Sequence, residues 1–182
     1  PTGDGIHSYL ARDVHSDGDY KVLKVGGKVL FNLDGFNDEF FFVAEGEFDA
    51  MSIWQTGFTS VVGLGGIGNK DKFVETISAM ETKPKAVVIA LDNDEAGIKT
   101  ANWINNELNK LNIYSLIINE KFEHYKDANG LLQHDPDTLK DILQEALEIA
   151  QDEANKRNEN TKSNNLPELP DNLKFDYETP AG

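Results

Sequence analysis

Carboxylate side chains follow two apolar runs of this sequence, and a group of acids of this kind could bind a divalent metal ion. One run ends at Leu91 and leads into Asp92 and Asp94, and an earlier run leads into Glu45 and Asp49. Like charges at this density repel one another unless a cation lies among them or water solvates them. Carboxylate oxygens are ligands for hard divalent cations, and Mg²⁺ fits best. The pattern therefore predicts a magnesium-binding group of acids.

Strands and helices are expected to alternate from residue 40 onward, which places these acids at one edge of a sheet. Periodicity and helix stop signals predict strands at 40–44, 59–62, 86–91 and 113–118, and helices at 47–56, 71–80, 95–111 and 136–153. This alternation is typical of an α/β fold with a mostly parallel sheet and helices on both faces. Ligands of such sheets bind beyond the carboxyl ends of the strands, so the acids should converge there.

The two ends of the chain have a different character. Lys21–Val25 and Lys28–Leu33 flank Gly26 and Gly27, which predicts a short β-hairpin with a two-residue turn. The last 28 residues, from Asn155 on, are rich in Asn, Pro and charge, as in a linker or tail. We therefore expect three parts: 1–38 with the hairpin, 39–154 as the catalytic domain, and 155–182 as a linker.

Composition narrows the class of protein. Apolar residues make up 39% and charged residues 27% of the 182 residues, as in a globular protein. No apolar run approaches the ~20 residues of a membrane span, and no cysteine is present for disulfides or zinc–thiolate sites. These features favour a cytoplasmic protein without membrane contact. A net charge of −15 argues against strong binding of nucleic acid by this chain alone. Because the chain starts at Pro1, we expect it to be part of something longer.

A glycine pattern offers a competing interpretation. Gly63, Gly65 and Gly68 match the G-x-G-x-x-G fingerprint of dinucleotide-binding folds, and Asp92 stands near the place of the ribose-binding acid. That interpretation leaves the acids of the preceding strand end unexplained. The second carboxylate, Asp94, would also repel a pyrophosphate unless a metal lay between them. The magnesium interpretation therefore accounts for more of the residues.

Three motifs in this order resemble the Toprim domain. This is the catalytic fold of bacterial-type DNA primases, type IA and type II topoisomerases, and some nucleases and recombination proteins. The sequence V-A-E-G-E-F-D-A at 43–50 fits the first motif, L-D-N-D-E-A-G at 91–97 fits the second, and K-D-A-N at 126–129 fits the third. The resemblance spans about residues 40–133. The residues of the first and third motifs most resemble those in primases of phages, plasmids and other mobile elements, including primase–helicase fusions.

This resemblance implies an enzyme that joins nucleotides with the help of Mg²⁺ or Mn²⁺. The expected activity is the synthesis of short RNA primers on single-stranded DNA. Glu45 is the expected general base, or a ligand if two metals bind. Asn129 stands where primases often have an acid, which leaves the number of metals open. The expected metal ligands are Asp92, Asp94, Asp49 and Asp127, and the candidates for contacting template or nucleotide are Lys21, Lys24, Lys28 and Asn129.

The resemblance also implies partners. Residues 8–12 and the predicted hairpin are similar to the end of the primase subdomain that precedes Toprim. An upstream zinc-binding module and a downstream helicase-like domain are expected in the parent protein, with single-stranded DNA and nucleoside triphosphates as substrates. Two alternatives stay open: a Toprim nuclease that cuts DNA, and a non-catalytic nucleotide-binding or docking module of a replication protein.

Overall fold

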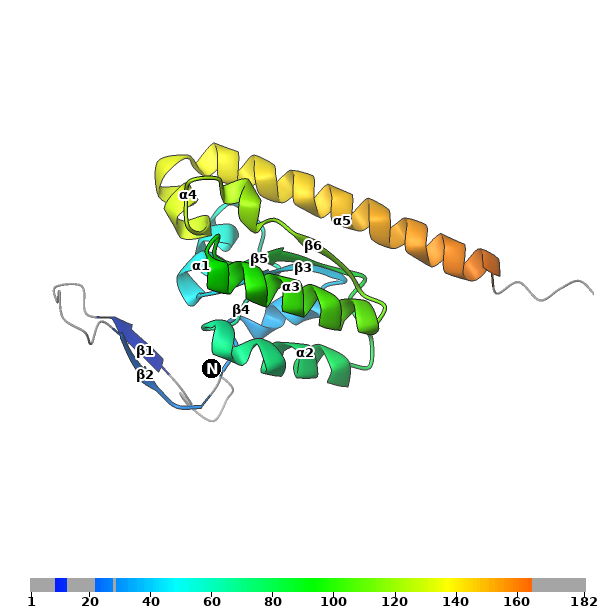
Figure 1. Ribbon diagram of the computed structural model, residues 1–182, viewed down its shortest axis with the longest axis horizontal. Helices are drawn as coiled ribbons and strands as arrows, with labels where there is room; N and C mark the ends of the chain where they lie inside the picture. Colours follow the sequence, from blue (N-terminus) through cyan, green and yellow to red (C-terminus); the bar gives the residue numbers. More distant parts are fainter. Residues whose placement is uncertain (1–8, 13–21, 28, 165–182) are drawn as a thin grey trace, which may run out of the picture.

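The structure is a computed structural model that describes residues 9–12, 22–27 and 29–164 (Figure 1). Its strands are β1 (Tyr9–Arg12), β2 (Val22–Val25), β3 (Phe40–Ala44), β4 (Val61–Gly63), β5 (Ala86–Ala90) and β6 (Tyr114–Ile117). Its α-helices are α1 (Glu47–Gln55), α2 (Lys70–Ala79), α3 (Glu95–Lys110), α4 (Ala128–His134) and α5 (Pro136–Asn164). Short 3₁₀ turns are η1 (Leu33–Asn37), η2 (Ile67–Asn69) and η3 (Asn119–Phe122).

A parallel sheet of four strands, in the order β4-β3-β5-β6, forms the centre of the molecule. Ala44 at the end of β3 pairs with Gly63 on one side and Ala90 on the other, so three strands end at one level. The chain passes from β3 to β4 on one side and then crosses to β5 on the other. The boundary between β3 and β5 is therefore the topological switch point, where ligands of open α/β sheets bind.

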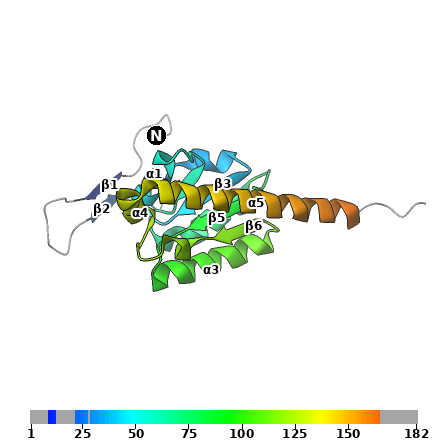
Figure 2. The same ribbon diagram turned by 90° about the horizontal axis from the view of Figure 1, so that it is seen from above.

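Side chains of the sheet alternate between two apolar layers, as the pleat of a strand requires. Phe42 and Val88 pack with α1, α4 and α5, whereas Phe41 and Ile89 pack with α2 and α3. Figure 2 shows α5 lying across the sheet. Burial of these layers is the main favourable term in folding. The predicted α/β fold, with a parallel sheet covered on both faces, is confirmed.

The predicted hairpin around Gly26 and Gly27 is wrong. β2 pairs with β1 in an antiparallel two-stranded sheet, and within the described residues no pairing joins it to the segment after the glycines. That segment turns to the central sheet instead: the Phe31 amide donates to the Gly63 carbonyl at 2.8 Å, and Leu30 is 3% exposed. Burial of this apolar segment beside β4 outweighs local hairpin formation.

The last helix is longer than the sequence predicted, because α5 continues past Glu153 to Asn164. No Gly or Pro interrupts the sequence between these two residues. Arg157 also lies over the ring of Tyr114 at 4.8 Å, which ties the extension to β6. Residues 155–164, expected to be linker, therefore belong to the helix. None of the helices in the described ranges is long and apolar enough to cross a bilayer.

Gly97, in the first turn of α3, lets that helix approach the end of β5. A Cβ at this position would lie 2.1 Å from the backbone oxygen of Asp92, and at Gly68 it would meet nothing within 4 Å. We predict that Gly97→Ala lowers the free energy of unfolding by at least about 2 kcal/mol, because backbone must move. Gly68→Ala is the control and should be close to neutral. Urea denaturation measures both, and equal stabilities would contradict the prediction.

Candidate functional site

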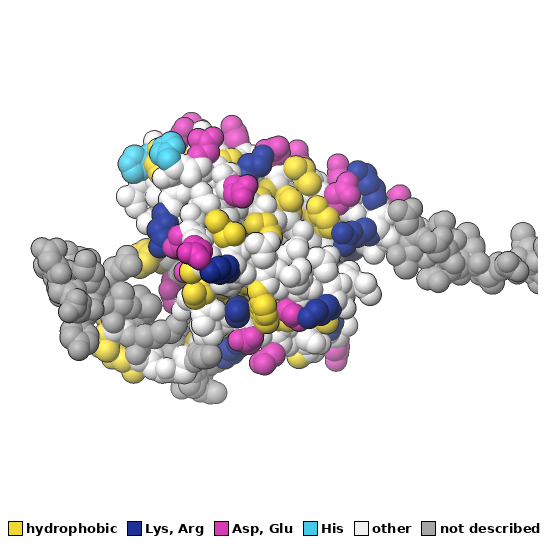
Figure 3. Space-filling model, in the orientation of Figure 1, with side chains coloured by type: hydrophobic (Ala, Val, Ile, Leu, Met, Phe, Trp, Pro, Cys, Tyr) yellow, Lys and Arg dark blue, Asp and Glu magenta, His cyan; other side chains and the backbone are white. Residues whose placement is uncertain are grey.

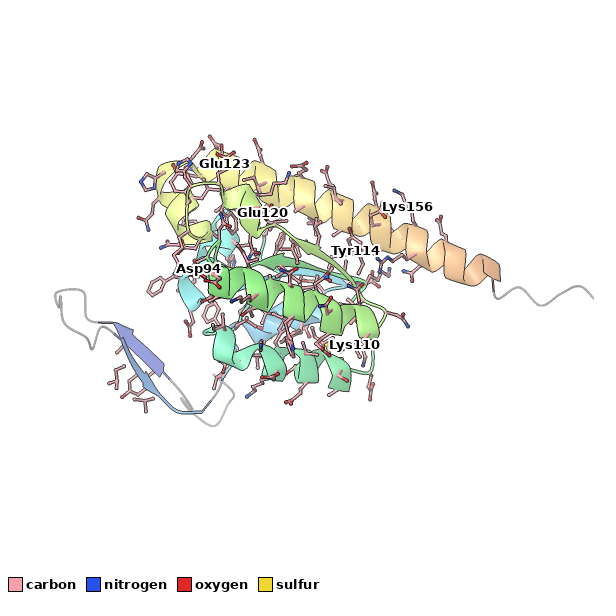
Figure 4. The ribbon with its side chains drawn as sticks, viewed as in Figure 1. Asp94, Lys110, Tyr114, Glu120, Glu123 and Lys156 are labelled. Carbon is pink, nitrogen blue, oxygen red and sulfur yellow. The ribbon has the colours of Figure 1, made fainter. Side chains whose placement is uncertain are left out.

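The carboxyl edge of the sheet gathers acids from separate segments of the chain. Glu45 follows β3, Asp92 and Asp94 follow β5, Asp49 lies in the first turn of α1, and Asp127 precedes α4. Figure 4 places Asp94 at the start of α3, at the end of the molecule where α1 and α4 also lie. The convergence predicted from the sequence is therefore present at the switch point.

Three of these acids lie close enough to share one cation. Asp49, Asp92 and Asp127 each offer a carboxylate oxygen, and the three oxygens lie within 4.8 Å of one another. Oxygen ligands lie about 2.0–2.6 Å from Mg²⁺ or Ca²⁺, so two on opposite sides of an ion are about 4–5 Å apart. The spacing fits a hard divalent cation. Asp92 is only 6% exposed, so its charge is poorly solvated without one.

Backbone hydrogen bonds at the start of three helices fix the orientation of the aspartates. Asp94 caps α3 by accepting from the Gly97 amide at 2.9 Å, and Asp127 caps α4 by accepting from the Gly130 amide at 2.6 Å. Asp49, in α1, accepts from the amide of Gly46 at 3.1 Å. Helix N-termini favour negative charge, which offsets part of the repulsion. Two of the carboxylates have a further partner, because Oδ2 of Asp94 contacts Lys126 at 3.4 Å and the Asn129 backbone amide also bonds Asp49.

Glu45 has a buried carboxylate oxygen, Oε2, that makes no hydrogen bond to the described residues. Burial, followed by the charges of Asp92 and Asp94, raises the pKa of Glu45 to about 7. The loop after β4 fixes the backbone, because the Gly66 amide donates to the Glu45 carbonyl at 2.9 Å. Buried carboxylate oxygens without partners are rare, and a bound cation or a proton would satisfy this one.

The other acids differ in how readily they ionise. Burial and the neighbouring Asp127 raise the pKa of Asp49 to about 6. Burial also raises the pKa of Asp92, although Lys126 acts against it. The amide of Gly97 lowers the pKa of Asp94, whose side chain is 43% exposed. The cluster therefore holds both protonated and ionised groups near neutral pH until a cation enters.

Lys126 is a site residue that the sequence analysis missed. Its Nζ atom lies 2.7 Å from Oδ2 of Asp92 and 3.4 Å from Oδ2 of Asp94. The hydrogen bond to Asp92 raises the pKa of Lys126 above its ordinary value, so the amine stays charged. The available signal was its position: a single lysine directly before Asp127, in the third motif.

The remaining candidates are three lysines and Asn129. Lys21 and Lys28 fall outside the described residues, and Lys24 lies in β2 with a side chain that is not described. The amide oxygen of Asn129 accepts a hydrogen bond from the Ser52 hydroxyl at 3.2 Å, which joins α4 to α1. Their contacts with template or nucleotide, and the metal-ligand role of Asp94, stay predictions.

The glycine-rich loop does not occupy the place that a dinucleotide site requires. In dinucleotide folds that loop follows the strand at the switch point, which here is β3. Gly63 is instead the last residue of β4, at one end of the sheet order, and Gly65 and Gly68 follow that strand. The loop continues along the end of β3, with the Leu64 amide donating to the Ala44 carbonyl at 2.9 Å. Its visible structural role is to support the segment that carries Glu45.

The raised pKa values of Glu45 and Asp49 predict a pH-dependent stability. Their ordinary values are 4.5 and 3.8, and the folded values are about 7 and about 6, so the folded state binds protons more tightly. The free energy of unfolding that these groups contribute must therefore fall as pH rises from about 4 to about 7. We predict that the metal-free protein loses stability over this range relative to a Glu45→Gln/Asp49→Asn variant. Urea denaturation at several pH values measures this, and parallel curves would contradict it.

Comparisons with known proteins agree with this geometry. A family model described as Toprim-like matches residues 42–132, which is half of the chain. A DNA primase from Mycoplasma genitalium is 31% identical over 116 residues, covering 62% of this chain. The chain spans only 18% of the length of that relative.

Two solved structures have a similar fold. The primase fragment of the bacteriophage T7 primase-helicase protein matches with a TM-score of 0.59 at 22% identity, covering 79% of this chain and 57% of that one. The Aquifex aeolicus primase, zinc-binding and RNA polymerase domains, matches with a TM-score of 0.58 at 18% identity, covering 79% and 36%. At these identities they support the fold alone. The match of the family model, over the segment that carries the acids, shows that the chain belongs to the Toprim-like family.

Proposed function

We propose that this chain is the catalytic part of a DNA primase that uses a divalent metal to join nucleotides into short RNA primers on single-stranded DNA. The observation that carries the proposal is the group of acids at the switch point, around the buried, unpartnered Oε2 of Glu45. The similarity to a DNA primase supports this activity over others of the family.

The metal would be held by Asp49, Asp92 and Asp127, whose oxygens have suitable spacing. We propose Mg²⁺, with Mn²⁺ as a substitute, since both accept carboxylate ligands. A bound ion would offset the negative charge that develops on the attacked phosphate. Asp94 is a further candidate ligand through the oxygen that does not cap α3, once Lys126 no longer contacts it.

Glu45 is the group best suited to take the proton from an attacking 3′-hydroxyl. A general base works most efficiently when its pKa lies near the working pH, and in the metal-free protein burial raises the pKa of Glu45 to about 7. The proton goes to the Glu45 carboxylate, and the 3′-oxygen bonds to the α-phosphorus of the nucleoside triphosphate. The bond between the α-phosphorus and the oxygen that bridges to the β-phosphate breaks, and pyrophosphate leaves. The backbone on both sides is fixed, by β3 before it and by the amide of Gly66.

Binding of template is proposed to need other parts of the parent protein. The net charge is −15, and the face shown in Figure 3 has acidic and basic side chains interspersed. Phosphate backbones bind where Lys and Arg cluster. An upstream zinc-binding module and a downstream helicase-like domain are the partners we propose, with nucleoside triphosphates and single-stranded DNA as substrates. The cytoplasmic location and the three-part domain division stay predictions.

Glu45 and Glu47 provide a matched pair for testing the function. Both are partly buried acids near the end of β3, but Glu47 lies in the first turn of α1, where it mainly favours the helix dipole. In the full-length protein we predict that Glu45→Gln lowers primer synthesis by about 10²–10⁴-fold, because a positioned general base is lost. Glu47→Gln should retain most of the activity. The assay measures incorporation of labelled ribonucleotides on single-stranded DNA.

The same assay separates the alternatives. Cut DNA without primers, in a reaction that needs Glu45, would identify a Toprim nuclease. Neither product, from a folded protein that still binds nucleotide, would favour a non-catalytic module. Unchanged primer synthesis by Glu45→Gln would contradict the role of Glu45.

A further inference from the structure

The ammonium group of Lys126 occupies a cation position at the rim of the acid cluster. It lies 2.7 Å from Oδ2 of Asp92, whose side chain is 9% exposed, and 3.4 Å from Oδ2 of Asp94. The Lys126 side chain as a whole is 61% exposed, so this residue approaches Asp92 from the solvent side. Within the described part of the chain, Lys126 is the partner in each ion pair recorded for these two aspartates.

Backbone hydrogen bonds hold Lys126 in this place. Asn93, between the two aspartates, donates its amide to the Lys126 carbonyl at 2.6 Å and its Nδ2 to the Glu123 carbonyl at 2.9 Å. Glu123 has a φ of 53°, an uncommon value for a residue with a side chain. From the other side, Asn119 Nδ2 donates to the Asp92 carbonyl at 3.0 Å. The loop that carries Lys126 is therefore fastened to the strand end that carries its partners.

We propose that Lys126 is the resident counter-cation of the metal-free site, that a divalent ion must displace it from Asp92, and that the freed ammonium group then contacts the anionic nucleotide. This inference rests on the proposed function, because it concerns the same site. An ammonium group and a divalent ion repel each other when both contact one carboxylate. A triphosphate would give the displaced charge a new partner. Lys126 would thus couple metal entry to nucleotide binding.

Two consequences follow for metal binding without nucleotide. Competition with Lys126 should make binding to the wild-type protein weak. Removing the Lys126 ammonium group should strengthen metal binding, because the ion then does not have to displace another cation from Asp92. We expect Lys126→Met to bind Mn²⁺ about tenfold more tightly than the wild type, as a change in Kd. Lys126→Arg keeps the charge and should stay close to the wild type.

Lys99→Met is the matched control, because it removes the same charge from a nearby position. Lys99 pairs with Glu95 at 2.6 Å, and its side chain is 73% exposed. Calorimetric titration with Mn²⁺, in the full chain and without nucleotide, should show less than a twofold change in Kd for this variant. Circular dichroism of each variant establishes that it is folded.

A second measurement uses the wild-type protein and needs no substitution. Acylation with a limiting amount of acetic anhydride, followed by mass spectrometry, reports how available each lysine amine is. We expect acylation of Lys126 relative to Lys99 to rise several-fold when saturating Mg²⁺ is added, since Asp92 no longer holds the amine. The ratio should remain unchanged when Na⁺ replaces Mg²⁺ at equal ionic strength.

The outcomes separate this inference from the proposed function. Mn²⁺ binding that Lys126→Met does not tighten beyond Lys99→Met, or a Lys126 acylation ratio insensitive to Mg²⁺, would overturn the counter-cation role alone. Absence of Mn²⁺ binding in every folded variant would overturn both the role and the proposed metal site. Tighter binding by Lys126→Met would support the role even if the parent protein made no primers.

Discussion

Repulsion between carboxylates is the constraint on which this structure depends. Glu45, Asp49, Asp92 and Asp127 are brought to one edge by a sheet whose strands all end there. The protein tolerates them in the metal-free state by protonation, which the raised pKa values of Glu45 and Asp49 reflect, and by one ammonium group, that of Lys126. Such an arrangement destabilises the fold unless a cation is bound, so its presence indicates a function.

The scaffold is built to hold the acids in spite of this repulsion. Two apolar layers pack on the sheet, and three helices begin at the site, where their N-termini favour negative charge. Asp94 and Asp127 belong to the acid cluster and also cap helices. The hydrogen bonds that begin α3 and α4 therefore also orient the carboxylates. Because Gly97 has no side chain, α3 can lie directly against the backbone of Asp92. Local helix formation and site geometry therefore support each other.

Much of this could be predicted from the sequence, because it depends on local patterns. Apolar runs followed by acids predicted β3 and β5 and their shared edge. The pairing of β2 with β1 was not predictable in this way, because the choice of strand partner depends on the burial of Leu30 and on the bridge from Phe31 to Gly63. The side-chain position of Lys126 depends on a loop whose conformation is set by Asn93. The length of α5 could have been predicted, because the sequence contains no Gly or Pro between Glu153 and Asn164 that would end the helix.

The central claim is that the acids form one divalent-cation site at the switch point between β3 and β5. A crystal of the protein grown or soaked with Mn²⁺ and measured at the manganese absorption edge tests it directly. The account predicts an anomalous difference peak bounded by carboxylate oxygens of Asp49, Asp92 and Asp127, with Lys126 moved away from Asp92. An ordered cluster without such a peak at saturating Mn²⁺, or a peak elsewhere on the molecule, would contradict it.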